Sequence, residues 1–288
     1  MNNAAKQRGV RERKARTGNR GVTLLLNAPY IFWLCLFVVI PMFIVAAYAF
    51  TDSSGAFTLE NFKELSVYKK NIIDSFVYAL IATAVTLVLA YPFAYFMTQR
   101  SEPTQRVMML LVMLPMWMNL LILTYSIMNL IETNGFINQL LETMGLAKLH
   151  MINTPGAVIF GMVYNYFPYM VLPLYSVLSK IDPALLEAAS DLGSGTLSRF
   201  RRVILPLSIP GVISGVTMVF VPSVSTFYIS QKLGGTSVNM IGDIIENLVN
   251  RVSTRNLGAM LSLVLMVVIL ICIMIMNRFS DEEGGIML

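Results

Sequence analysis

The residues of this chain that are best suited to hold a partner protein lie in a polar break between two long apolar runs. Glu187 and Asp191 are four residues apart, so both carboxylates fall on one face of a helix and can meet basic side chains of another protein. Asp182 can cap that helix, Pro183 suits its first turn, and Gly193 can end it. The pattern predicts a short helix suited to docking; the alternative for Asp191 is a solvated carboxylate with no partner.

A second helix in the same loop is predicted to begin near Ser194 or Thr196 and to be broken by Pro206. Its apolar residues fall mainly on one side, and its basic residues on the other are Arg199, Arg201 and Arg202. Residues 182–206 should therefore form a helical hairpin in the aqueous phase. The alternative is an amphipathic hairpin that lies on the bilayer surface, where the arginines touch lipid phosphates.

A second group of distinctive residues combines acids with aromatic rings. Asp243 and Glu246 belong to a short apolar piece, Val238–Val249, and their spacing of three puts them on one helical face. Acids and aromatic faces both stabilise a cation in a low-dielectric path. The predicted pathway contains these acids together with Trp117, Asn119, Tyr125, Tyr169 and Tyr228. For each aromatic the alternative is packing or the interfacial belt; for the acids it is headgroup water.

The sequence contains no pattern typical of catalysis or of a bound cofactor. His150 is the one histidine, and Cys35 and Cys272 both lie inside apolar runs without a partner motif. The P-loop pattern G-x-x-x-x-G-K-[ST] does not occur. We therefore predict a non-catalytic chain that holds neither a metal ion nor its own ATP.

Composition places the chain in a membrane. Of its 288 residues 56% are hydrophobic and 13% are charged, against about 25% charged in soluble domains. Helical spans are predicted at Val22–Phe50, Ile72–Thr98, Val107–Ile131, Thr154–Leu178, Ile209–Ile229 and Leu257–Met276. Pro41 should kink the first, Pro115 should break the third and Pro222 should interrupt the fifth. Ile137–Leu146 is too short to cross and should lie at the interface, and Val238–Val249 has the length of a re-entrant or interfacial piece.

Basic residues set the predicted orientation. With the N-terminus inside, inner segments hold fourteen of the 21 lysines and arginines, half of them in the tail 1–20. Both termini and the hairpin should then be cytoplasmic, with a permease domain over 21–280 and a tail over 281–288. The basic tail favours anionic lipid headgroups over nucleic acid. The outer segments are almost neutral, so bulk charge does not select a cation.

The hairpin resembles the coupling loop of membrane subunits of bacterial ABC importers. The shared pattern is Glu-Ala-Ala, three residues, Gly, nine residues, a branched aliphatic, one residue and Leu-Pro, with Val203 where the family usually has Ile. The resemblance implies that this loop docks into a groove of an ATPase subunit. The residues that it implicates, together with the neighbouring Asp191, are Glu187, Ala188, Ala189, Gly193, Leu205 and Pro206.

A more specific resemblance covers roughly residues 105–260 and is to PotB-type permeases of spermidine/putrescine importers. It rests on Leu114-Pro115-Met116-Trp117, Thr124-Tyr125, Phe167 to Ser176, the run from Asp182 through the hairpin, Phe227-Tyr228, Leu233-Gly234-Gly235 and Ile241-Gly242. The chain departs from some polyamine permeases at Asp243, where they have an amide.

These resemblances imply an all-α protein of six transmembrane helices with the type I ABC importer permease fold, in the bacterial cell membrane. The implied partners are an ATPase dimer that holds ATP and Mg, a second, PotC-type permease and an extracytoplasmic binding protein. Importers of thiamine, ferric iron or sulfate are alternatives. An ion-coupled secondary transporter is a further alternative, but such a carrier has no need of a docking loop.

Overall fold

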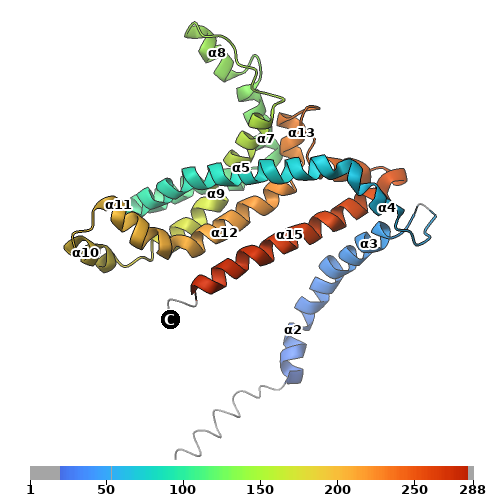
Figure 1. Ribbon diagram of the computed structural model, residues 1–288, viewed down its shortest axis with the longest axis horizontal. Helices are drawn as coiled ribbons and strands as arrows, with labels where there is room; N and C mark the ends of the chain where they lie inside the picture. The colour runs from blue at the N-terminus through green and yellow to red at the C-terminus, as the bar shows by residue number, and fades with distance from the viewer. Residues whose placement is uncertain (1–19, 53, 285–288) are drawn as a thin grey trace, which may run out of the picture.

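The computed structural model describes residues 20–52 and 54–284 and is almost entirely helical (Figure 1). The first half contains α2 (Arg20–Leu34), the π-turn η1 (Cys35–Val39), α3 (Ile40–Ala49), α4 (Glu60–Lys63), α5 (Leu65–Thr98), α6 (Glu102–Trp117), α7 (Leu120–Ile131) and α8 (Phe136–Thr143). The second half contains α9 (Pro155–Leu178), α10 (Pro183–Asp191), α11 (Thr196–Arg199), the π-turn η2 (Phe200–Ile204), α12 (Leu205–Val224), α13 (Tyr228–Leu233), α14 (Ile241–Val249), the short η3 (Val252–Thr254) and α15 (Arg255–Gly284). The predicted basic tail, apart from Arg20, lies outside the described residues.

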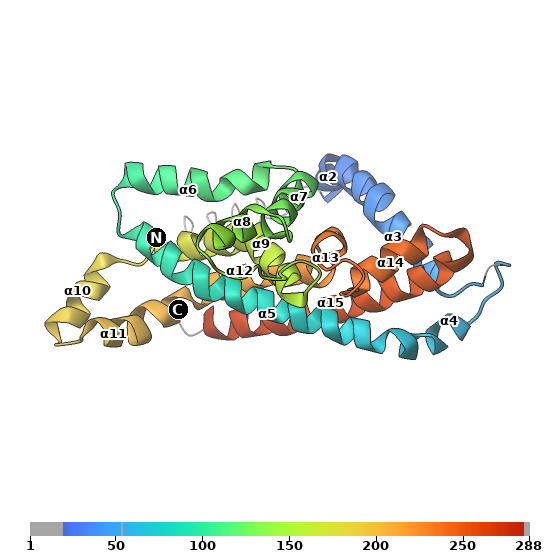
Figure 2. The same cartoon turned by 90° about the horizontal axis from the view of Figure 1, so that it is seen from above.

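A bundle of α5, α9, α12 and α15 forms the centre of the molecule, and the four helices run side by side in both views (Figures 1 and 2). On α5 the alanines 79, 82, 90 and 94 are fully buried, and such small side chains let helices approach closely. Thr83 and Thr86 are also buried, but each hydroxyl donates to a carbonyl one turn earlier in the same helix. The core therefore accepts these polar residues without leaving their hydroxyl groups unpaired.

Six helical stretches of the described chain are long and apolar enough to cross a membrane, as predicted. They are Asn27–Ala49, Leu65–Thr98, Leu120–Thr143, Pro155–Leu178, Thr196–Val224 and Val252–Met276. The fourth agrees with its prediction to one residue because Thr154, the predicted start, caps α9: its hydroxyl accepts from the Ala157 amide at 3.2 Å. The second begins earlier than predicted, because the polar first turns of α5 are helical as well.

The first span stands apart from the bundle, and α3 is the part of it that packs against α15 (Figure 1). Large apolar side chains such as Phe32 and Phe43 are exposed along it, as expected of a helix whose solvent is lipid. The predicted kink at Pro41 takes the form of a π-turn. The Ile40 amide bonds the Cys35 carbonyl five residues back, directly before the proline.

The third predicted span is divided more sharply than expected. The helix ends at Trp117, and Met118 and Asn119 are extended before α7 begins. The predicted break after Pro115 is thus confirmed, but α6 runs along the bundle whereas α7 and α8 lead away from it (Figures 1 and 2). The long apolar stretch therefore runs from Leu120 to Thr143, so the prediction of one span over 107–131 is wrong in its bounds.

The predicted interruption at Pro222 is also wrong. The helix continues through this proline to Val224, and the chain turns only at residues 225–227 before α13. Between the fifth and sixth spans α14 has nine residues, a length of roughly 14 Å. This confirms the prediction of a helical piece too short to cross the bilayer.

Candidate coupling and transport sites

The first helix of the hairpin, α10, forms as its end signals predict. The Asp182 carboxylate accepts from the Ala184 amide at 2.9 Å, and Pro183 occupies the first turn. At the other end Gly193 has a positive φ of 78°, its amide bonds the Ser190 carbonyl, and the next amide bonds the Ala189 carbonyl. This pair of bonds is a Schellman motif, which a residue without a β-carbon adopts at little cost.

The second half of the hairpin differs from its prediction, because Pro206 does not break the helix. Residues Thr196–Val224 are continuous through the π-turn η2. In that turn the Leu205 amide bonds the Phe200 carbonyl, five residues back, directly before Pro206. The wider turn takes up the missing N–H and the bulk of the proline ring, which would disrupt a regular helix here. The hairpin is therefore joined to α12 without a flexible link.

The tip of the hairpin presents acids beside apolar side chains. Glu187 and Asp191 are both exposed, while Leu192 is 87% exposed and Leu197 is 80% exposed. Arg199 is half-buried, and its guanidinium donates to the Ser190 hydroxyl at 2.6 Å, which ties α11 to α10. The tip thus places exposed apolar side chains next to exposed acids.

The predicted pathway residues come from elements that pack together. The short helix α13 contacts α7, α9 and α14, so Tyr125, Tyr169, Tyr228 and the two acids lie on neighbouring helices. Trp117, at the end of α6, is 71% exposed. Asn119 caps α7, where its Oδ1 accepts from the Leu121 amide at 2.8 Å. The sequence predicted that the amide lies at the break but did not predict this capping bond.

The aromatic rings of this set differ in their surroundings. Tyr169 meets Tyr166 edge-on at 6.2 Å between ring centroids, and Tyr228 is half-buried with the Lys232 ammonium 5.7 Å from its centroid. Tyr125 is exposed. Tyr228 thus already faces a cation of its own chain, whereas Trp117 and Tyr125 leave their faces open.

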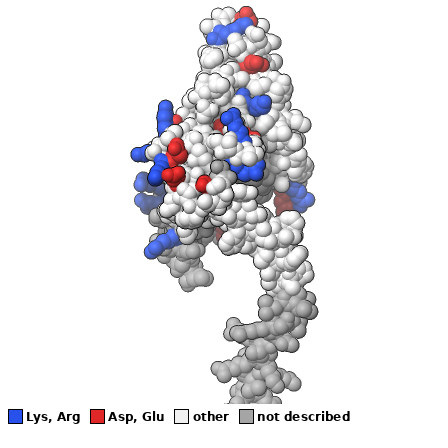
Figure 3. Space-filling model, turned by 90° about the vertical axis from the view of Figure 1, so that its right-hand side faces the viewer, with Lys and Arg blue, Asp and Glu red and all other residues white. Residues whose placement is uncertain are grey.

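The two predicted acids do not share one environment. Asp243 is 3% exposed, and its Oδ2 accepts from the Met240 amide at 3.0 Å in a capping box at the start of α14. Its other oxygen, Oδ1, has no hydrogen-bond partner. Glu246 is half-buried and accepts from Gln231 at 3.2 Å and Asn250 at 2.7 Å. The acids belong to one helix, but only Glu246 reaches the surface. On the face of the molecule shown in Figure 3, basic and acidic side chains are interspersed.

Burial raises the pKa of Asp243 from 3.8 to about 6. The nearby Ser230 side chain and the Met240 amide favour the ionised form, although the Ser230 hydroxyl itself donates to the Phe227 carbonyl at 3.0 Å. The folded chain thus binds this proton more tightly than the unfolded chain does. Its contribution to stability is complete below pH 3.8 and is lost as pH rises to about 6.

Asp243→Asn should remove this dependence, because an amide oxygen can still accept from Met240 but does not titrate. As the pH rises from 3.8 to about 6, the free energy of unfolding of the parent should fall by roughly 3 kcal/mol, and that of the variant should not show this fall. Thermal unfolding of the purified protein between about pH 4 and pH 7 measures the difference. Glu246→Gln is the matched control and should keep the slope of the parent. Parallel curves for Asp243→Asn and the parent would contradict the prediction.

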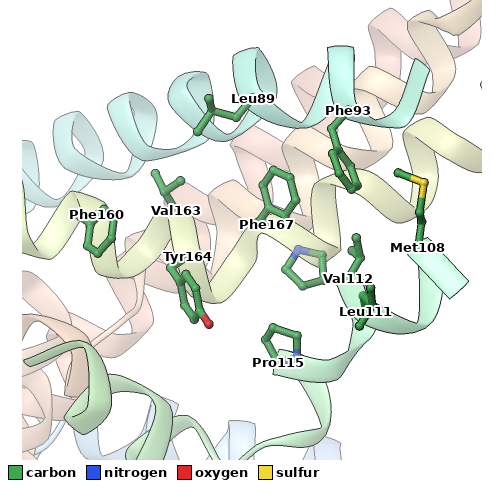
Figure 4. Close-up of a pocket in the computed structure, with 11 residues that line it drawn as sticks. Leu89, Phe93, Met108, Leu111, Val112, Pro115, Phe160, Val163, Tyr164 and Phe167 are labelled. Atoms are coloured by element: carbon green, nitrogen blue, oxygen red, sulfur yellow. The ribbon is translucent and has the colours of Figure 1, made fainter. Parts of the chain in front are cut away.

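The cavity shown in Figure 4 is not lined by the predicted pathway residues. It has a volume of about 540 Å³ and lies between α5, α6 and α9. Apolar side chains dominate its wall, among them Leu89, Met108 and Phe160, and the Tyr164 ring is its one titratable member. A wall of this kind suits lipid chains or apolar side chains and offers a polycation no acid.

Comparison with known proteins gives the family. Residues 87–282 match the family described as binding-protein-dependent transport system inner membrane component. The spermidine/putrescine transport system permease protein PotB of Haemophilus influenzae is 39% identical over 225 residues, which are 75% of this chain and 79% of that protein. PotB of Escherichia coli K12 is 36% identical over 258 residues, which are 86% of this chain and 94% of that protein.

Solved structures confirm the predicted fold class. A bacterial ABC transporter involved in the import of the acidic polysaccharide alginate contains a chain with a TM-score of 0.73 and 17% identity, and the match covers 94% of this chain and 99% of that one. A chain of the bacterial alginate ABC transporter in complex with an alginate pentasaccharide-bound periplasmic protein has a TM-score of 0.72 and 16% sequence identity. The match covers 91% of this chain and 94% of that one. The fold is that of type I ABC transporter permeases, and the chain is a multi-pass inner membrane protein.

The family match over residues 87–282 includes the C-terminal part of α5, nearly all the rest of the bundle, the hairpin and the helices of the predicted pathway. The chain therefore belongs to the inner membrane components of binding-protein-dependent transport systems and, among them, to the PotB permeases.

Proposed function

We propose that this chain is the permease subunit of an ATP-driven importer and translocates spermidine or putrescine that an extracytoplasmic binding protein delivers. ATP hydrolysis, with its Mg, belongs to a separate ATPase dimer, and a second, PotC-type permease completes the pathway. The observation that carries the proposal is the exposed hairpin, whose acids and leucines are unpacked at the tip while its second helix runs unbroken into the bundle.

The hairpin residues act together in this proposal. Glu187 and Asp191 meet basic side chains of the ATPase, and Ala188 and Ala189 keep the face between them shallow. Gly193 turns the chain, and Leu205 with Pro206 begins the helix that carries motion onward. The hairpin and both termini lie in the cytoplasm, where ATP is available, and the orientation is supported by the excess of basic residues in the inner segments.

The substrate assignment is supported by the PotB relatives and by the residues near α13. Glu246 offers a half-buried carboxylate, and Trp117 and Tyr125 offer open aromatic faces. A cation gains about 0.5–2 kcal/mol from each such face. Trp117, Asn119, Tyr125, Tyr169, Tyr228, Asp243 and Glu246 are the residues that we place along the pathway. Of these, Asn119 and Asp243 act by holding helix ends in position.

The complex purified with its ATPase, second permease and binding protein tests this function. Reconstituted in vesicles, its ATPase activity should rise when spermidine or putrescine is added with the binding protein, and the polyamine should accumulate inside. Thiamine, ferric iron and sulfate serve as the competing solutes. Stimulation by one of these alone, or uptake driven by an ion gradient without ATP, would overturn the proposal.

Trp117→Ala should lower polyamine uptake about fivefold, which corresponds to about 1 kcal/mol, the upper end for a cation–π contact at an exposed ring. Because Trp117 is 71% exposed, its loss leaves little packing behind, and assembly should be preserved. Trp33→Ala is the matched control, because Trp33 is the other tryptophan of the chain and is also exposed. Trp33 lies on α2, and its ring contacts that of Phe37 in η1. Equal uptake by the two variants would remove Trp117 from the pathway.

A further inference from the structure

One aromatic side chain joins the hairpin to the bundle. Phe200 is the first residue of the π-turn η2, between α11 and α12. Its ring meets Tyr91 edge-on at 5.6 Å between centroids and Tyr95 at 6.4 Å. Both tyrosines lie one turn apart on α5, so Phe200 is held between two rings of a helix that belongs to the centre of the bundle. We call these three residues the aromatic clamp.

A buried hydrogen bond to Ser208 holds Tyr91 of the clamp in place. The Tyr91 hydroxyl and the Ser208 hydroxyl are 2.7 Å apart, and Ser208 also donates to the Leu205 carbonyl at 2.9 Å. Ser208 is fully buried and lies on α12 just after the π-turn. Tyr91 therefore contacts the first residue of η2 through its ring at Phe200 and the helix just after η2 through its hydroxyl at Ser208.

The rest of the hairpin root is packed more loosely. A cavity of about 240 Å³ separates it from the end of α5 and the start of α6. Ile181, Pro183 and Leu186 line the hairpin side, while Tyr95 and Gln105 line the other. Close-packed contacts transmit displacement and empty space does not. Ile181 and Leu186 touch the core beside this cavity, and the clamp adds a direct ring contact from the hairpin to α5.

We propose that the aromatic clamp is the positioning device that makes α5 follow the hairpin when the ATPase moves it. The proposal rests on the proposed docking of the hairpin and deepens it by naming the residues that pass the motion on. Phe200 touches neither ATPase nor substrate; it acts by holding two helices together. Phe200 packs on α5 at the residue where the π-turn begins, and the helix continues through that turn into α12.

Spin labels test the clamp without reference to the transported solute. The chain, with Cys35 and Cys272 replaced by serine, takes labels at Leu185→Cys on α10, away from the tip, and Val88→Cys on α5; these residues are 49% and 70% exposed. In the full complex, the parent distance should stay the same with and without trapped ATP. With Phe200→Ala it should shift by about 2 Å or more, the scale of helix displacements at interfaces. Solute imported per ATP should fall about fivefold or more.

Two further variants separate positioning from packing. Phe167→Ala removes an edge-on contact between the rings of Phe167 and Phe93, whose centroids are 5.7 Å apart in the bundle. It therefore removes the same kind of ring contact as Phe200→Ala, but at a place away from the hairpin. It should lower thermal stability but leave the label distance and the import per ATP unchanged. Phe200→Leu keeps most of the volume and carries the test if Phe200→Ala does not assemble.

Three results would overturn the clamp: a parent distance that changes with ATP, a Phe200 variant whose distance does not, or equal loss of coupling in the Phe167 and Phe200 variants. If the parent imports no polyamine, the substrate assignment fails by itself, because the distance measurement needs trapped ATP but no transported solute.

Discussion

Glu187→Lys is expected to lower solute import about tenfold or more while the six spans remain folded. Glu187 is exposed on α10, close in sequence to Leu192 at the tip, so reversing its charge disturbs no internal contact. At the ATPase it would set a positive charge against the basic groups that the acid is proposed to meet, and juxtaposed like charges cost several kcal/mol. Loss of about 1.4 kcal/mol already corresponds to tenfold weaker binding.

Copurification of the ATPase and uptake in vesicles measure this effect. Glu102→Lys is the matched control, because Glu102 is also a highly exposed acid and lies in a predicted inner segment, at the first residue of α6. Its ion pair with Arg106, 3.4 Å long, lies at the surface. That variant should bind the ATPase and import solute as the parent does. If Glu187→Lys retains the ATPase and imports at the parent rate, the hairpin is not the coupling site.

Gly242→Ala should destabilise the protein by about 1–3 kcal/mol, the usual range for overpacking. Gly242 is the second residue of α14, and a β-carbon there would clash with the Thr226 carbonyl oxygen and lie 2.7 Å from that of Ser225. Both neighbours are backbone atoms, so neither can rotate away. The start of α14, including the Asp243 cap, would have to move from the turn that ends α12.

Thermal unfolding of the purified variant and its yield after size exclusion report the loss. Gly156→Ala is the matched control, since Gly156 is likewise the second residue of its helix, α9. A β-carbon there would meet the Thr154 hydroxyl at 3.7 Å, an ordinary contact. Its stability should change by less than about 1 kcal/mol, the helix-propensity difference between the two residues. Equal stability of both variants would show that α14 can shift freely.

Local patterns were enough to predict the membrane class, the presence of six spans and the first half of the hairpin. Apolar runs of about 20 residues have one stable solution in a bilayer, and Asp182, Pro183 and Gly193 act within a single turn of their own positions. The break between α6 and α7 was predictable for the same reason, because Pro115 and the capping Asn119 lie beside it.

The tertiary structure decided three features: the helix that continues through Pro206, the burial of Asp243 and the packing of Phe200 against α5. A proline predicts a break only if the helix keeps its regular turn, and the π-turn that preserves the helix forms where Phe200 packs against α5. Asp243 is buried because Gly242 lets α14 approach the end of α12. Each outcome depends on residues brought together from distant parts of the chain, and their packing energy exceeds the local preference that the sequence displays.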